Sequence, residues 1–257
     1  MRDAQFAIPL HYDRHFDVIR AATPTLRHEA YRLRYQVYCV ENAFEDPEQH
    51  ISDCESDDED DRSIHTLLLH RRTNEIAGTT RVILPDERRP LPVATLLHGS
   101  ERRRFDGFPV AHTAELSRFA VSKQFRRRRD EERYADVGLG DAALIETERR
   151  LMPFISLGLI RGMFDICLEY EITHLAAVME PPLIRILHRL GLGFTPIGGS
   201  VMHHGLRQPC FASLDDLIQH SRETDSIVWQ YAFEPLLQEH NDERLHAVAE
   251  PAYRVAV

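Results

Sequence analysis

SIHTLLLHRRTNEIAGTTRVILP, residues 63–85, contains two strand-like runs joined by a short turn. Both runs are rich in β-branched and aliphatic side chains, and Thr73 and Asn74 between them are typical of a hairpin. A third run of the same kind, HTAELSRFAVS at residues 112–122, comes after a proline-containing stretch. The sequence therefore predicts an antiparallel meander at the centre of the fold.

Helical patterns lie on both sides of this meander in the chain. Residues 24–41 place apolar and aromatic side chains at helical spacing, with Thr23 and Pro24 as cap and first turn. The expected elements after the meander are helices at 153–170 and 181–191, strands at 173–180, 194–199 and 205–214, and a last helix capped by Ser213. This order predicts an α/β protein whose twisted, mixed and mostly antiparallel sheet is covered by helices on both faces.

Composition limits the function classes. The 257-residue chain has 43% hydrophobic residues and a net charge of −10, which supports a folded core and argues against a nucleic-acid or anionic-membrane binder. The N-terminus lacks a secretory signal pattern, and the most apolar run, residues 153–168, is too short to span a bilayer, so we expect a cytoplasmic protein. The four cysteines form no C-x-x-C pair, so we expect reduced thiols and no metal site.

The chain resembles a known family through several short motifs. They are YRLRYQVY at 31–38, NAF at 42–44, ESDDEDD at 55–61, GTTRVILP at 78–85 and ELSRFAV at 115–121. In order and nearly in spacing they resemble the N-acyl-homoserine lactone synthases, which have the fold of the GCN5-related N-acetyltransferase (GNAT) superfamily. LIRILHRLGLGFTPIG at 183–198 resembles the closing helix, turn and strand of that superfamily.

The second half of the chain resembles a different branch. Residues 179–217 look like the acyltransferases associated with the PEP-CTERM/exosortase system, relatives thought to be N-acyl amino acid synthases. The two resemblances imply one GNAT-like acyltransferase domain over residues 24–235, with an N-terminal extension at 1–23 and a C-terminal extension at 236–257.

The resemblance to the synthases implies a set of site residues. They are Arg34 and Tyr38 on the first helix, Phe44 where the synthases usually have tryptophan, Asp57 and Asp60 in the acidic loop, Arg81 on one strand, and Glu115, Ser117 and Arg118 on the next. Acyl transfer from a thioester to an amine needs a base for the amine, and Glu115 is the expected general base, on one strand face with Ser117. The alternative is a solvent-facing strand glutamate. The superfamily also implies a bulge in this strand that frees a backbone N–H for the thioester oxygen.

The charged members of this set alternate in sign. Arginines and acids arranged in this way can close a pocket by ion pairs that hold the acidic loop over the acceptor. Two alternatives remain at this point: the seven acids of residues 53–61 form a merely solvated run, or Arg34 or Arg81 pairs with a carboxylate of the acceptor.

Phe119 follows Arg118 and belongs to a group of large apolar residues with two interpretations. Tyr38, Phe44, Phe119, Phe154, Leu157 and Leu159 either line an acyl-chain tunnel or form part of the core.

A run of basic residues ends the third strand of the meander. It consists of Lys123, Arg126, Arg127, Arg128 and Arg129. Acyl carrier protein is acidic, so these residues, together with Arg102 to Arg104, are expected to dock the carrier or to hold the phosphate of phosphopantetheine. The alternative is a solvated cluster.

Together these features predict an N-acyltransferase that moves a long-chain acyl group from acyl carrier protein, or from acyl-CoA, to the amine of an amino acid or a related small molecule. No bound cofactor is expected. One alternative is a homoserine lactone (autoinducer) synthase that uses S-adenosylmethionine. Another is a non-catalytic protein that binds acyl carriers.

Overall fold

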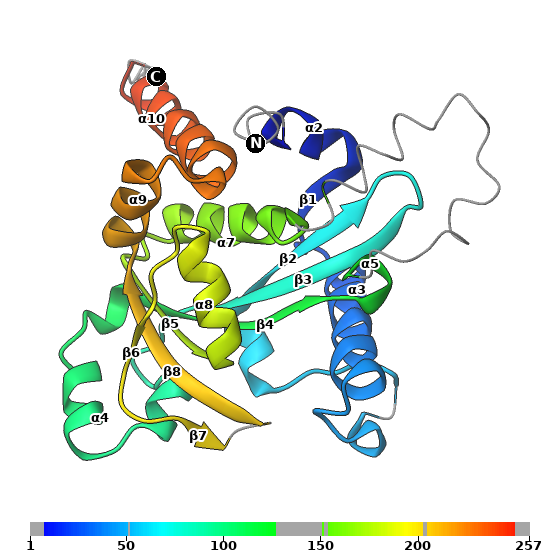
Figure 1. The fold of residues 1–257 in the computed structure, drawn as a ribbon, viewed down its shortest axis with the longest axis vertical. Coiled ribbons are helices and arrows are strands. Elements are labelled where there is room, and N and C mark those ends of the chain that lie inside the picture. Colours follow the sequence, from blue (N-terminus) through cyan, green and yellow to red (C-terminus); the bar gives the residue numbers. More distant parts are fainter. Residues whose placement is uncertain (1–7, 51, 127–150, 152–153, 203–204, 250–257) are drawn as a thin grey trace, which may run out of the picture.

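The expected meander forms the middle of an eight-stranded sheet in the computed structural model, which describes residues 8–50, 52–126, 151, 154–202 and 205–249 (Figure 1). The strands are β1 Phe16–Arg20, β2 Ser63–His70, β3 Glu75–Ile83, β4 Thr113–Val121, β5 His174–Met179, β6 Thr195–Pro196, β7 Val201–Met202 and β8 Leu206–Ser213. Their order is β1-β2-β3-β4-β5-β8-β6, and β7 also pairs with β8. The pairing of β4 with β5 is parallel and the other pairings are antiparallel, so the predicted mixed, mostly antiparallel sheet is confirmed.

The hairpin of β2 and β3 turns where the sequence predicts it. Asn74 has a positive φ of 55°, a conformation that asparagine tolerates better than most residues, and it precedes the first residue of β3. Expected strand 173–180 is β5, whereas expected strand 194–199 shrinks to the two residues of β6.

The sheet begins upstream of residue 24, inside the expected N-terminal extension at residues 1–23. β1 pairs along its whole length with β2, and Tyr12 on the preceding helix α2, Ile8–His15, is fully buried in the main core. The signal for β1 is weak because the strand is five residues long and mostly half-buried. At the other end of the chain, Leu236 also belongs to the main core.

Helices cover both faces of the sheet, as expected. They are α3 Pro24–Tyr35 with a π-helical continuation at Gln36–Glu41, α4 Gly99–Phe105, α5 Lys123–Arg126, α7 Leu157–Glu169, α8 Pro181–Arg189, α9 Leu214–Glu223, a π-helical turn at Trp229–Phe233 and α10 Glu234–Ala249. Short 3-10 helices occupy Pro47–Gln49, Asp58–Arg62, Pro92–Leu96 and Val110–His112.

Two helix starts that the sequence predicts are present with their caps. The Thr23 hydroxyl accepts a hydrogen bond from Leu26 N at 3.2 Å, and the Ser213 hydroxyl accepts one from Asp216 N at 3.4 Å. The helix expected from residue 153 begins at Leu157 instead, and residues 152–153 lie outside the described part of the chain.

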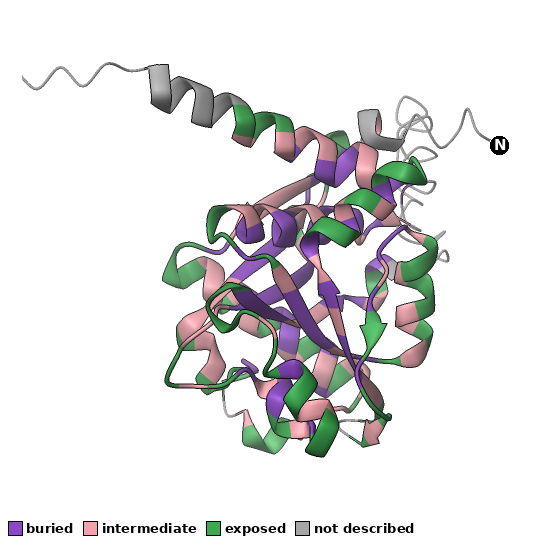
Figure 2. Cartoon of the chain, turned by 90° about the vertical axis from the view of Figure 1, so that its left-hand side faces the viewer, coloured by how far each residue is buried: buried purple, intermediate pink, exposed green. Residues whose placement is uncertain are grey.

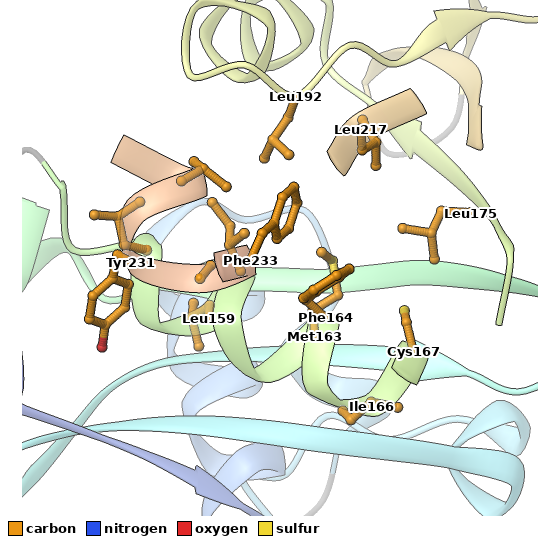
Figure 3. Packing of buried hydrophobic residues seen from close by; sticks show 14 of the residues in the cluster. Leu159, Met163, Phe164, Ile166, Cys167, Leu175, Leu192, Leu217, Tyr231 and Phe233 are labelled. Atoms are coloured by element: carbon orange, nitrogen blue, oxygen red, sulfur yellow. The ribbon is translucent and has the colours of Figure 1, made fainter. Parts of the chain in front are cut away.

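The main core lies between one face of the sheet and α7. Figure 3 shows Leu159, Met163 and Phe164 of α7 among buried side chains from the later helices, and Figure 2 shows the buried residues concentrated on the sheet strands and the helix faces toward them. Close approach of α7 to the sheet requires glycine, since a Cβ atom at Gly162 would lie 2.3 Å from Thr66 Cγ2. On the opposite face, α3 packs against β3 and β4. That opposite face carries the site.

Candidate active site

Glu115 is the third residue of β4 and is buried, with 4% of its surface exposed, so the alternative of a solvent-facing glutamate is wrong. Its carboxylate Oε2 accepts a hydrogen bond from Val93 N at 2.8 Å, and its neighbours in register are Ile83 on β3 and Ala176 on β5. Burial among these groups raises the pKa of Glu115 to about 7, against the opposing effects of the Val93 hydrogen bond and the positive charge of Arg81. A carboxylate with this pKa can exchange a proton near neutral pH.

The pairing of β4 with β5 stops one residue after Glu115. The parallel register runs from Thr113 opposite His174 to Leu116 opposite Ala177. β5 then continues beside β8 as far as Met179, while β4 continues beside β3 as far as Val121. The two central strands therefore part from each other one residue beyond the carboxylate.

A β-bulge follows at Arg118 and Phe119, as the resemblance implies. Ser117 stands opposite Arg81 and Ala120 opposite Thr79, so Thr80 faces two residues of β4. Arg118 has a φ of 50°, in the left-handed region. A bulge takes one residue out of the hydrogen-bond ladder and turns the chain. The turn explains why the side chain of Arg118 reaches the acidic loop on the same side of the sheet as Ser117.

Three arginines and three acids from four separate segments meet on this side of the sheet. The first part of this charged cluster centres on Glu55, which is 1% exposed. Glu55 accepts hydrogen bonds from Arg34 Nε at 2.5 Å and from Arg118 Nη2 at 2.8 Å. Burial alone would raise the pKa of Glu55, but the hydrogen bonds from Arg118 and Arg34 outweigh it and hold the pKa well below its usual range.

The second part of the cluster joins the loop to β3 and β4. Arg81 Nη1 contacts Asp57 Oδ1 at 2.5 Å and Asp60 Oδ1 at 2.8 Å, and Arg34 Nη1 contacts the same Asp60 atom at 2.6 Å. Arg81 Nε donates to Ser117 Oγ at 2.9 Å. Arg34, Asp57, Asp60, Arg81 and Arg118 thus lie together, as the alternation of sign predicts.

The acidic run is folded. Asp57 caps the 3-10 helix Asp58–Arg62 by accepting from Glu59 N at 3.0 Å, and Asp60 Oδ2 accepts from Asp57 N at 2.8 Å in return. Within this run Asp58 and Asp61 face solvent. The interpretation of the whole run as merely solvated is therefore wrong, because the buried Glu55 and Asp60 and the partly exposed Asp57 all pair with arginines.

Sequence reasoning missed two members of the cluster. Glu55 is the first acid of the E-x-D-x-x-D spacing, and this position was its available signal. His65 is 1% exposed, lies opposite Arg81 on β2, and has its Nε2 atom 3.4 Å from Asp60 Oδ1. Burial and the charge of Arg34 lower the pKa of His65 to about 4, so its imidazole is neutral at pH 7. No sequence signal marked His65, since its role depends on strand register.

Of the three aromatic residues expected in the site, Tyr38 and Phe44 lie beside the charged cluster, whereas Phe119 does not. The guanidinium carbon of Arg118 is 5.5 Å from the ring centroid of Tyr38, whose ring is 6.3 Å from that of Phe44. Phe119 packs against the main core. Leu157 and Leu159 are buried members of that core and Phe154 packs against it, as the core interpretation expects.

The expected basic docking residues fall mostly outside the described part of the chain. Arg127, Arg128 and Arg129 lie there, and Arg126 ends α5. Lys123 is described: its backbone N donates to the Glu41 carboxylate at 2.9 Å, and its Nζ contacts the Glu41 carbonyl oxygen.

Two features are absent from the described residues. They contain no group of three or more histidine, cysteine, aspartate or glutamate residues placed to hold a metal ion. No helix among them has the length and apolar character needed to cross a membrane. The four cysteines are free thiols, and all four are buried.

Comparison with known proteins bears on the fold of the chain. Residues 33–134 match the family model described as an acetyltransferase (GNAT) domain. No curated protein matches the chain significantly.

Solved structures with the same fold include three synthases or related proteins. FeeM, an N-acyl amino acid synthase from uncultured soil microbes, has a TM-score of 0.53 at 16% identity, and the match covers 84% of this chain and 97% of FeeM. TofI, solved with an inhibitor and MTA, has a TM-score of 0.53 at 19% identity and covers 79% of this chain and 96% of its own. BjaI, a CoA-dependent acyl-homoserine lactone synthase solved with SAM and isopentyl-CoA, has a TM-score of 0.50 at 19% identity. The match covers 82% of this chain and 90% of BjaI.

These likenesses show the fold that the chain shares with the three structures, and the family-model match over residues 33–134 identifies this fold as GNAT-like. The family-model match over β2, β3 and β4 supports an acyltransferase, and it includes the strand that carries Glu115.

Proposed function

We propose that this protein is an N-acyltransferase that moves a long-chain acyl group from the thioester of acyl carrier protein to the amine of an amino acid or a related small molecule. The observation that carries the proposal is the position of Glu115. It is a buried carboxylate with a pKa of about 7, one residue before β4 and β5 part. An amine nucleophile needs a base of this kind, placed where a thioester can approach between diverging strands.

The reaction joins the amine nitrogen to the acyl carbon and breaks the carbon–sulfur bond. Glu115 takes the proton that the nitrogen loses. The carrier leaves as a thiolate and takes up this proton from Glu115 by way of solvent, so that the thiol forms and the carboxylate is restored. The bulge at Arg118 and Phe119 supplies an unpaired strand residue next to the base, which suits a backbone donor for the thioester oxygen.

Ser117 is suited to the leaving group. Its Oγ accepts a hydrogen bond from Arg81 Nε at 2.9 Å, so its own hydroxyl proton is available to another acceptor. The positive charge of Arg81 makes that hydroxyl a better donor to a developing thiolate. Ser117 lies two residues from Glu115, on the same face of β4 by strand alternation.

The choice of acyl carrier protein as donor rests on the sequence. The arginines at 126–129 give an otherwise acidic chain a concentrated positive segment, which would attract an acidic carrier. The resemblance of residues 179–217 to exosortase-associated acyltransferases supports an amino acid as acceptor, and so does the fold that the chain shares with FeeM. We place the protein in the cytoplasm, where acyl carrier protein is made.

A lactone synthase is the second candidate, because BjaI has the same fold. Phe44, in place of the tryptophan of those synthases, argues against it. Purified protein should be incubated with palmitoyl carrier protein or palmitoyl-CoA and with either the twenty amino acids or S-adenosylmethionine, and products identified by mass spectrometry. An N-acyl amino acid supports the proposal, an acyl-homoserine lactone supports the second candidate, and carrier binding without any product supports a non-catalytic carrier-binding protein.

A further inference from the structure

Arg207 on β8 occupies a different position from the arginines of the charged cluster. Its guanidinium carbon lies 5.2 Å from the ring centroid of Phe44, and its Nη1 contacts the carboxylate of Glu180. The Arg207 side chain is 13% exposed, whereas that of Glu180 is 47% exposed. Among the described residues, Arg207 thus pairs with a carboxylate that has ready access to water.

The arginines of the charged cluster are already neutralised. Arg34, Arg81 and Arg118 each contact at least two carboxylates. Arg34 keeps one nitrogen, Nη2, without a hydrogen-bond partner among the described residues, but its side chain is fully buried. Adding a further carboxylate to this balanced, buried cluster would place an uncompensated negative charge in a poorly hydrated site, which is costly.

Arg207 lies on the same side of the sheet as Glu115. Glu115 stands opposite Ala176, and Ala176 stands opposite Phe211 on β8. Since alternate residues of a strand share a face, Phe211, Pro209 and Arg207 share the face of Glu115. The contact of Arg207 with Phe44 agrees, because Phe44 follows the helix that packs on that face of β3 and β4.

The distance between the two residues fits a small acceptor. The backbones of Glu115 and Arg207 are separated by two strand spacings, from β4 across β5 to β8, and by four residues along β8. This corresponds to about 16 Å. Both side chains are long, and that of Arg207 leans toward the β4 side, where Phe44 lies. The floor between them is lined by Val178 and Pro209, which have the same facing.

We infer that Arg207 binds the carboxylate of the amine acceptor, and that this carboxylate displaces the side chain of Glu180 from Arg207. The planar guanidinium matches a carboxylate through two parallel hydrogen bonds, and the ion pair with Glu180 shows that the site accepts this group. Glu180 can turn to water when it is displaced because half of its side chain is already exposed. The inference rests on the proposed function for the acceptor's amine, and it narrows the acceptor to molecules that carry a carboxylate.

Binding measurements separate this inference from the proposed reaction. Each of the twenty amino acids is titrated against the protein by calorimetry, and any that binds is compared with its own amide, which keeps the amine and lacks the negative charge. We expect the acid to bind about 10- to 100-fold more tightly than the amide. R207A should bind the two equally, whereas R185A, which removes an exposed arginine on α8, should bind like the wild type.

The exchange itself is tested with E180Q. This variant removes the competing negative charge and leaves Arg207 in place, so the acid should bind more tightly than it does to the wild type. R207K, which keeps the charge without the fork, should recover part of the preference for the acid. An acid preference that survives in R207A overturns the inference, and so does a wild type that binds no acid better than its amide.

A phosphate of the acyl donor is also an anion that an arginine can bind. A separate experiment tests whether Arg207 binds this phosphate instead of the acceptor carboxylate. Turnover of palmitoyl-CoA is compared with that of the palmitoyl thioester of N-acetylcysteamine, which has no phosphate. We expect R207A to impair both donors by the same factor. A loss confined to palmitoyl-CoA would assign Arg207 to the donor and overturn the inference. If no variant forms any N-acyl product while the acid preference is present and depends on Arg207, the proposed function fails and the carboxylate site stands.

Discussion

Arg118 donates three hydrogen bonds to the carboxylate of Glu55, at 2.8, 3.0 and 3.1 Å, and so ties the bulge of β4 to the acidic loop. Arg34 on α3 holds the other side of the same carboxylate. The carboxylate therefore joins a helix, a loop and the strand that carries Glu115. The shape of the site depends on this buried connection.

Replacing Glu55 by glutamine should destabilise the protein strongly. The change removes one negative charge and leaves Arg34 and Arg118 short of a partner in a buried site, a loss of about 3–5 kcal/mol in the free energy of unfolding. Urea denaturation at pH 7 measures it. The matched control is D58N, an exposed acid of the same loop, which should change the free energy by less than about 0.5 kcal/mol. Equal effects of the two substitutions would show that the cluster contributes nothing to stability.

The close approach of α7 to the sheet predicts a second effect on stability. A Cβ at position 162 would lie 2.3 Å from Thr66 Cγ2, so G162A should cost about 1–3 kcal/mol through overpacking. A Cβ at Gly193 meets nothing within 4 Å, which makes G193A the control. Thermal unfolding of both variants tests the packing, and a G162A protein as stable as G193A would contradict it.

Burial of Glu115 should make stability depend on pH. Its pKa in the folded protein, about 7, is above the unfolded value of 4.5, so the contribution of the group is fully present below pH 4.5 and is lost as the pH rises through 7. Glutamine in E115Q stays neutral at every pH, so the variant does not lose stability in this way as the pH rises. The variant should match the wild type at pH 4.5 and be more stable by about 3 kcal/mol at pH 8.

Urea denaturation of the wild type and E115Q from pH 4.5 to pH 8 measures this gap. The exposed E87Q variant serves as control and should show a constant difference from the wild type across the range. A gap between E115Q and the wild type that does not widen with pH would mean that Glu115 is an ordinary carboxylate.

The arginine run predicts a selective effect on the donor. Reversing two charges in the double variant R127E/R128E should reduce kcat/KM for palmitoyl carrier protein by about 10-fold or more, because charge steers the encounter with an acidic partner. The rate with the small palmitoyl thioester of N-acetylcysteamine should stay unchanged. Raising the salt concentration should narrow the difference between the wild type and the double variant. Equal losses with both donors would remove these arginines from carrier docking.

Most elements of the fold could be predicted from local sequence patterns. The capped start at Thr23, the turn at Asn74 and the apolar run of β5 are each determined by nearby residues, and all three are present in the structure. β1 was missed because a five-residue strand with one buried and four half-buried residues gives little periodic signal. Its pairing with β2 also depends on a segment more than 40 residues away.

The site residues that could be predicted are those whose spacing in a sequence motif indicates that they contact one another. The E-x-D-x-x-D spacing led to Asp57 and Asp60, which do meet the predicted arginines. The central place of Glu55 and the burial of His65 follow from the strand register and from the fold of the acidic loop, which no single-strand pattern encodes. The contact of Arg207 with Phe44 brings residues 163 positions apart together, so only the tertiary structure reveals it.

The central claim is that Glu115 accepts the proton of the amine, and the pH dependence of turnover by the wild type and E115Q tests it most directly. With palmitoyl carrier protein and the amino acid identified as acceptor, kcat of the wild type should rise with pH around 7, as the carboxyl group of Glu115 loses its proton. E115Q should be slower by about 100-fold or more and should lack this rise, with its fold intact. An E115Q enzyme that turns over at the wild-type rate with the same pH dependence would contradict the account.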